Sequence, residues 1–114
     1  MNRRTRKNLE LIHRIFKEDP RSHVLFFSPV ESEDSVARQL LALESGVAPE
    51  DVDARPSDRA VLAAAETVRG WNLEIDTSPR PALKDVVRKI QGALLDKPVD
   101  VMIFDAPGAI RNNK

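Results

Sequence analysis

Several kinds of residue are scarce or missing in this 114-residue sequence, which has no cysteine, no tyrosine, one tryptophan and four glycines. Without cysteine there is neither a disulfide nor a thiolate metal site, as is typical of proteins from a reducing compartment. No apolar run approaches the length of a membrane span, and the N-terminus lacks the apolar segment of a signal peptide. We therefore expect a cytoplasmic protein with no membrane partner.

The motifs of the common nucleotide-binding and hydrolytic sites are also missing. The glycines stand far apart, so the sequence has no phosphate loop of the GxxxxGK[ST] or GxGxxG kind. It has no Ser-His-Asp, Cys-His or HExxH arrangement either. His13 and His23 are too isolated to indicate a metal site.

Charge is balanced overall but unevenly distributed. The 18 basic and 18 acidic residues cancel, so the whole chain has no basic footprint for nucleic acid. A basic cluster near the start comprises Arg3, Arg4, Arg6 and Lys7. It is either a solvated helix end or a phosphate-binding patch, and DNA binding through it would be weak and would fall steeply with salt.

Apolar periodicity predicts one domain, residues 1–114, with helices and strands in alternation. The expected order is a helix over 5–19, a strand over 24–27, a helix closed by Gly46, a turn or short helix within 47–56, a helix over 57–69, a strand over 71–76, a helix from Pro81 and a strand over 99–104. Strands separated by helices are typical of right-handed crossovers. We expect a three-layer α/β fold with a short, mainly parallel sheet of about three strands flanked by helices.

Two details of this prediction concern individual residues. The run VDVMIF at 99–104 is apolar almost throughout, which favours a central strand buried on both faces. In the helix over 57–69, Ser57 is the expected N-cap and four residues are expected to face inward: Val61, Leu62, Ala65 and Val68.

Polar residues follow each expected strand. Ser28 and Glu31 come after the first strand. Asp76 ends the second strand and is followed by Thr77 and Ser78, and Asp105 comes after the third strand. The carboxyl ends of parallel strands meet at one edge of a sheet, where ligands of open α/β proteins bind. Asp105 there is either a turn or cap residue or a carboxylate that holds hydrated magnesium against a nucleotide phosphate.

Several local strings, taken in order, resemble the RecA-like ATPase domain of DnaB-type replicative DNA helicases. The string VLFFS is followed by Pro29-Val30-Glu31, in place of a SLEM-like motif, and by a helix that contains Arg38. The string WNLEIDTSPRPALKDVVRKI matches a strand with an IDD-like end and the helix after it, and VMIFD places Asp105 at the end of a Walker B-like strand. The resemblance covers nearly the whole chain and implies a partial RecA-like, P-loop NTPase core.

The resemblance also implies roles for individual residues. Asp105 would coordinate magnesium, Glu31 would be the catalytic glutamate, and Ser28 and Asp76 would contact the cofactor. The sequence departs from the family in that the catalytic glutamate aligns with Val30, one residue before Glu31. The family's phosphate loop would also precede the helix over 5–19, at which this chain begins.

These departures lead to two functional hypotheses. The first is a degenerate helicase-like module without autonomous ATPase activity, which acts in DNA replication by contacting a helicase, another replication factor or its own copies. The alternative is a nucleotide-binding ATPase subunit that takes Mg²⁺ and ATP only when another chain completes its site. Phosphoryl transfer depends on positioning and charge stabilisation, so we expect no cofactor on the chain alone.

Two further resemblances are weaker. VDVMIFDAPG is similar to the aspartate-proline string of ParA or MinD-type ATPases, which also need a glycine-rich lysine loop. A receiver-like module with Asp105 as phosphate acceptor would need an acidic pair on the first strand, and VLFFSP has none.

Overall fold

The computed structural model describes residues 1–54, 57–78, 83–96 and 98–105. Its elements follow the predicted order, and the segment 47–56, expected to hold a turn or a short helix, contains a short helix. They are α1 (Arg3–Glu18), β1 (His23–Phe27), α2 (Glu33–Ser45), α3 (Pro49–Ala54), α4 (Arg59–Arg69), β2 (Asn72–Asp76), α5 (Leu83–Asp96) and β3 (Val101–Phe104). None of the described helices is both long enough and apolar enough to cross a bilayer.

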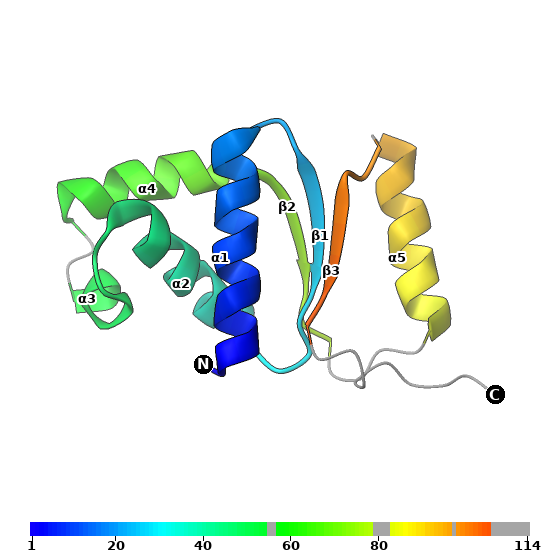
Figure 1. Cartoon of the computed structure of the whole chain (residues 1–114), viewed down its shortest axis with the longest axis horizontal. Helices are drawn as coiled ribbons and strands as arrows, with labels where there is room; N and C mark the ends of the chain where they lie inside the picture. Colours follow the sequence, from blue (N-terminus) through cyan, green and yellow to red (C-terminus); the bar gives the residue numbers. More distant parts are fainter. Residues whose placement is uncertain (55–56, 79–82, 97, 106–114) are drawn as a thin grey trace.

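The three strands form one parallel sheet in the order β2-β1-β3 (Figure 1). In the shared register, Phe26 of β1 lies between Ile75 of β2 and Ile103 of β3. Helices cover both faces of the sheet, with α5 on one side and α1 and α2 on the other. The predicted three-layer α/β fold with a three-stranded parallel sheet is confirmed.

The prediction that the 99–104 run is the central strand is wrong. All five residues of β1 are buried, whereas β3 lies at an edge and its Met102 is 47% exposed. Both strands are apolar on both faces, so their side chains do not distinguish them. Backbone pairing on both edges of β1 makes it the centre.

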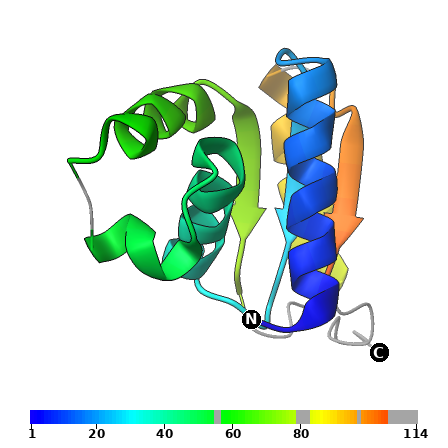
Figure 2. The same ribbon diagram turned by 60° about the vertical axis from the view of Figure 1, so that its left-hand side comes forward.

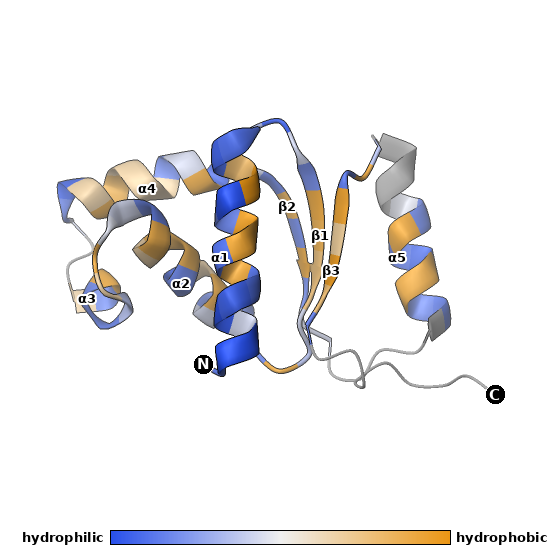
Figure 3. Ribbon diagram, in the orientation of Figure 1, coloured by the Kyte–Doolittle hydropathy of each residue, from blue (hydrophilic) through white to orange (hydrophobic). Residues whose placement is uncertain are grey.

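The larger core lies between the sheet and helices α1 and α2. Leu9, Ile12 and Phe16 form the buried stripe of α1, and they pack against β1 together with α2. Figure 2 shows α1 running along the sheet over β1, and Figure 3 shows apolar and polar bands alternating along the same helix. The second core, under α5, is smaller and includes Leu25, Phe27 and Val86.

Helix ends are set by side-chain and glycine caps. Ser32 is the N-cap of α2, and its Oγ accepts from the backbone N–H of Ser35. Gly46 ends α2 in the left-handed conformation at φ 76°, which glycine adopts without the steric penalty of a Cβ atom. Gly46 therefore ends α2 where the sequence predicts.

The prediction for α4 is wrong in its cap and in one inward residue. Asp58, and not Ser57, is the N-cap, because its carboxylate accepts from the N–H groups of Ala60 and Val61. Leu62 is 53% exposed, and the buried position is taken by Ala64. The stretch VLAAA is apolar on every side, so its period does not select a face; packing of Val61 against α2 and α3 does.

Candidate functional site

The ends of all three strands meet at one edge of the sheet, as the parallel arrangement requires. The backbone N–H of Ser28 donates to the carbonyl of Asp76 at 2.8 Å, and that of Asp105 donates to the carbonyl of Phe27 at 2.8 Å. The chain passes from β1 to β2 on one side and then to β3 on the other side of β1. Ser28 and Asp105 therefore lie at the point where the strand order reverses, which is where open α/β sheets bind ligands.

The carboxylate of Asp105 is buried, with 1% of the residue exposed, and it is surrounded by donors from its own chain. Its Oδ2 accepts from Thr5 Oγ1 at 2.5 Å and from Ser28 Oγ at 2.9 Å. Its Oδ1 accepts from Asn8 Nδ2 at 3.0 Å, and Arg4 Nε lies 3.9 Å from the same oxygen. We name these five residues the Asp105 cluster: Arg4, Thr5, Asn8, Ser28 and Asp105.

The Asp105 cluster fastens the first turns of α1 to the sheet. Thr5 and Asn8 are three residues apart and so lie on one face of the helix. The hydrogen bonds span 97 and 100 residues of sequence, which makes them long-range contacts between the beginning of the fold and its last strand. In this arrangement Asp105 is a structural acceptor that holds α1 in position.

Neither Thr5 nor Asn8 is among the site residues predicted from the sequence. A signal for Thr5 was present, because it continues the buried stripe of Leu9, Ile12 and Phe16 with a polar residue. A polar group at a core-facing position needs a hydrogen-bond partner, which here is Asp105. Asn8 carries no comparable signal, because it lies outside the buried stripe of α1 and is only half-buried.

Magnesium binding by Asp105 stays a prediction. The geometry shows which contacts of Asp105 a bound cation would have to replace. A cation that took either carboxylate oxygen would displace at least one hydrogen bond from Thr5, Ser28 or Asn8. It would also approach the positive charge of Arg4. Within the part of the chain that the structure describes, no group of three or more potential metal ligands is found.

The other predicted catalytic and cofactor residues have contacts of their own. Glu31 Oε1 accepts from Ser35 Oγ at 2.8 Å, so its carboxylate is bonded to the first turn of α2. Asp76 Oδ1 accepts from the N–H of Ser78 at 2.9 Å and stabilises the turn after β2. Asp76 adjoins Ser28 through the backbone, whereas Glu31 has no hydrogen bond to the Asp105 cluster among the described residues.

The basic cluster occupies the exposed surface of the first two turns of α1. Arg4 is its member nearest to Asp105. For the other three, Arg3, Arg6 and Lys7, the structure shows no ion pair with any described residue. This placement agrees with a solvated helix end, one of the two interpretations of the basic cluster. The exposed charges lie beside the carboxyl edge of the sheet.

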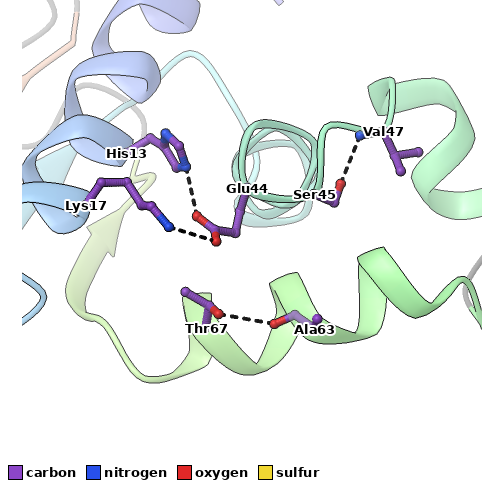
Figure 4. Close-up of polar contacts among 7 residues, drawn as sticks. All are labelled: His13, Lys17, Glu44, Ser45, Val47, Ala63 and Thr67. Carbon is purple, nitrogen blue, oxygen red and sulfur yellow. Dashed lines mark hydrogen bonds and ion pairs between the residues drawn. The ribbon is translucent and has the colours of Figure 1, made fainter.

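The two histidines bind carboxylates on opposite sides of the sheet. His13 Nε2 lies 2.9 Å from Glu44 Oε1, and Lys17 Nζ donates to Glu44 Oε2 at 3.2 Å, which ties α1 to α2 (Figure 4). His23 is buried, with Nε2 at 2.8 Å from Glu74 Oε2 and Nδ1 at 3.1 Å from the carbonyl of Pro98. Among the described residues, each imidazole ring lies beside one carboxylate, and each histidine joins elements that are distant in sequence.

The contacts of His23 predict a stabilising role for this side chain. Replacing His23 by alanine is expected to lower the free energy of unfolding by about 2–3 kcal/mol, because the carboxylate of Glu74 and the carbonyl of Pro98 lose their partner. Urea denaturation measures this effect. Glu74→Gln is the conservative comparison, because it keeps an acceptor for the imidazole. If Glu74→Gln lowered the free energy of unfolding as much as His23→Ala, the stabilising role assigned to the His23 side chain would be contradicted.

Glu44 predicts a pH dependence of stability. Partial burial is the largest influence and raises the pKa of Glu44, but hydrogen bonds from His13 and Lys17 and their charges outweigh it, so that the pKa is lowered from 4.5. A lowered pKa stabilises the fold fully above pH 4.5, and the contribution is lost as pH falls through the pKa of the folded state.

Glu44→Gln is therefore expected to flatten the decrease in stability below pH 4.5. Thermal denaturation across acid pH measures it. Glu66→Gln, at an exposed pair with Arg69, is the matched control and should leave the profile unchanged. Identical acid profiles for Glu44→Gln and the unmodified chain would refute the role of Glu44.

No family model matches the chain, and no curated protein matches its sequence. The class of protein is therefore defined by the fold and the site alone. It is a small α/β protein with a three-stranded parallel sheet, in which a buried aspartate follows the last strand at the reversal point of the strand order.

Proposed function

We propose that this chain is a degenerate helicase-like module of the DnaB type, without ATPase activity of its own, that acts in DNA replication by contacting a replicative helicase or another replication factor. The observation that carries the proposal is that the carboxylate of Asp105 is already hydrogen-bonded within the chain. Its carboxylate, the expected magnesium ligand, accepts three side-chain hydrogen bonds from its own chain.

Three strings of the resemblance supply the strands of the sheet. VLFFS runs through β1, WNLEID ends with β2, and VMIFD covers β3 and Asp105. Their ends come together in space although the strings are separated along the chain. This arrangement supports the proposal that the chain retains the sheet of a nucleotide-binding domain. The hydrogen bonds that Asp105 and Glu31 accept within the chain favour a role other than catalysis.

The proposal is tested by an activity assay and a binding assay on the full chain. With Mg²⁺ and ATP, release of phosphate should not exceed the background. The chain should co-elute with the replicative helicase of its own host in size-exclusion chromatography at micromolar concentration, and an unrelated protein of similar size is the control. Absence of association with the helicase and with other replication factors, or turnover of ATP by the chain alone, would overturn the proposal.

A second candidate is a nucleotide-binding subunit whose site is completed by another chain. The gathering of Ser28, Asp76 and Asp105 at the reversal point of the sheet favours it. Calorimetric titration with magnesium and ATP, with and without the helicase, separates the two. Binding that appears only in the mixture and is lost in Asp76→Asn would support the second candidate, and no binding at millimolar nucleotide in either sample would exclude it.

The basic cluster adds a weaker proposal for nucleic acid. Exposed charges at Arg3, Arg6 and Lys7 attract phosphate, but the neutral chain as a whole adds no further attraction. Any DNA affinity is therefore expected to be low and to fall steeply with salt.

A further inference from the structure

The edge strand β3 is apolar on both faces. Val101 and Ile103 pack in the core under α1, whereas Met102 and Phe104 are register partners of Leu25 and Phe27, which face α5. Met102 is nonetheless 47% exposed. Among the described residues, no strand pairs with the outer edge of β3. A strand of this composition is normally covered on both faces and paired on both edges.

The two edges of the sheet differ in how they are protected. Soluble proteins protect edge strands by charged residues, proline or bulges. β2 follows this rule, because Asn72, Glu74 and Asp76 alternate along it. β3 has the sequence VMIF, with no charged residue and no proline. An apolar edge of this kind is a template for pairing with another strand.

We propose that β3 pairs with β3 of a second copy in antiparallel orientation, which joins two three-stranded sheets into one six-stranded sheet. The dimer goes beyond the proposed function and does not depend on it. A two-fold axis perpendicular to the sheet keeps the α1 side of one copy continuous with the α1 side of the other. The interface is then the same surface on both copies, as in a closed dimer.

The charges around β3 are compatible with pairing to a second copy in a register centred on Met102. When Met102 lies opposite Met102 of the second copy, Val101 lies opposite Ile103 and Asp100 lies opposite Phe104. No two acidic residues face each other in this register. Asp100 Oδ2 accepts from the N–H of His23 at 2.8 Å, and Asp105 is enclosed in its cluster, so both flanking carboxylates are bonded within their own chain.

The same comparison disfavours pairing of β3 with β2 of another copy. That contact would place the side chains of Met102 and Phe104 beside Glu74 and Asp76, which lie on the same face of the sheet. It would also be a head-to-tail contact, which leaves a free edge at each end and continues into a filament. The apolar and acidic edges therefore direct association to β3 alone.

The oligomeric state and its dependence on Met102 test the proposal. Light scattering coupled to size-exclusion chromatography should show a dimer at micromolar concentration. Met102→Lys places two like charges opposite each other and should raise the dissociation constant by more than about tenfold. Leu62→Lys, at an equally exposed apolar residue of α4, is the matched control and should remain dimeric.

Mixing two variants tests the symmetry of the register. Met102→Lys and Met102→Glu should each be monomeric, and their equimolar mixture should dimerise, because lysine then faces glutamate. Circular dichroism of each variant confirms that the monomer is folded. A monomeric unmodified chain, a dimer that survives Met102→Lys, or a mixture that stays monomeric would each overturn the proposal.

A cross-link provides an independent measurement of proximity. Since the chain has no cysteine, Met102→Cys introduces a single thiol. Directly opposite residues of antiparallel strands have Cβ atoms about 4.5–5.5 Å apart, close to disulfide range. Mild oxidation should give a covalent dimer for Met102→Cys and not for Leu62→Cys, whereas equal yields for the two variants would contradict the β3 interface.

Discussion

Replacing Asp105 by alanine is expected to lower the free energy of unfolding by about 3–5 kcal/mol. Hydrogen bonds to a charged group contribute about 1.5–3 kcal/mol each, and the substitution removes the acceptor of Thr5, Asn8 and Ser28 together. Part of that loss is offset because a buried charge no longer has to be desolvated. Urea denaturation in the absence of divalent cations measures the change.

The sign of the effect separates a structural aspartate from a metal ligand. A carboxylate kept for magnesium is unfavourable when no metal is bound, so its removal would stabilise the metal-free chain. Asp105→Asn keeps the shape and removes the charge, and Thr5→Val removes one donor. Both are expected to destabilise, and their effects should not add, because the two residues share one hydrogen bond. Increased stability of Asp105→Asn would refute the structural role.

Phe26→Ala is expected to have an effect of similar size, about 3–5 kcal/mol, through loss of packing. Phe26 is 1% exposed in the central strand β1, between Ile75 and Ile103 in the register. Its removal leaves a cavity in the larger core that neighbouring side chains on a sheet cannot fill without moving the strands. Urea denaturation followed by the fluorescence of Trp71, the single tryptophan, measures the loss.

Two variants make this experiment decisive. Leu62→Ala removes an apolar side chain that is 53% exposed and should change stability by no more than about 0.5 kcal/mol. Phe26→Leu creates a smaller cavity and remains measurable if Phe26→Ala does not fold. Equal stabilities for Phe26→Leu and Leu62→Ala would show that β1 does not carry the core.

Only those residues of the candidate site that follow a strand could be predicted from the sequence. Ser28 and Asp105 follow apolar runs, and a parallel sheet brings such ends together, so their contact was expected and is present. Thr5 and Asn8 belong to a helix and reach the site only because α1 lies along the sheet. Glu31 lies close in sequence to Ser28 but bonds to Ser35, because its side chain lies at the start of α2.

The sequence by itself determined which segments are helices and strands and that the strands run parallel. These properties follow from local spacing of apolar residues and from the helices between the strands. It did not determine that β1 is central and β3 peripheral, nor that Asp105 is enclosed by α1. Those properties depend on backbone pairing and on contacts across about a hundred residues, where many side-chain patterns are compatible with more than one arrangement and the lowest free energy of the whole fold selects among them.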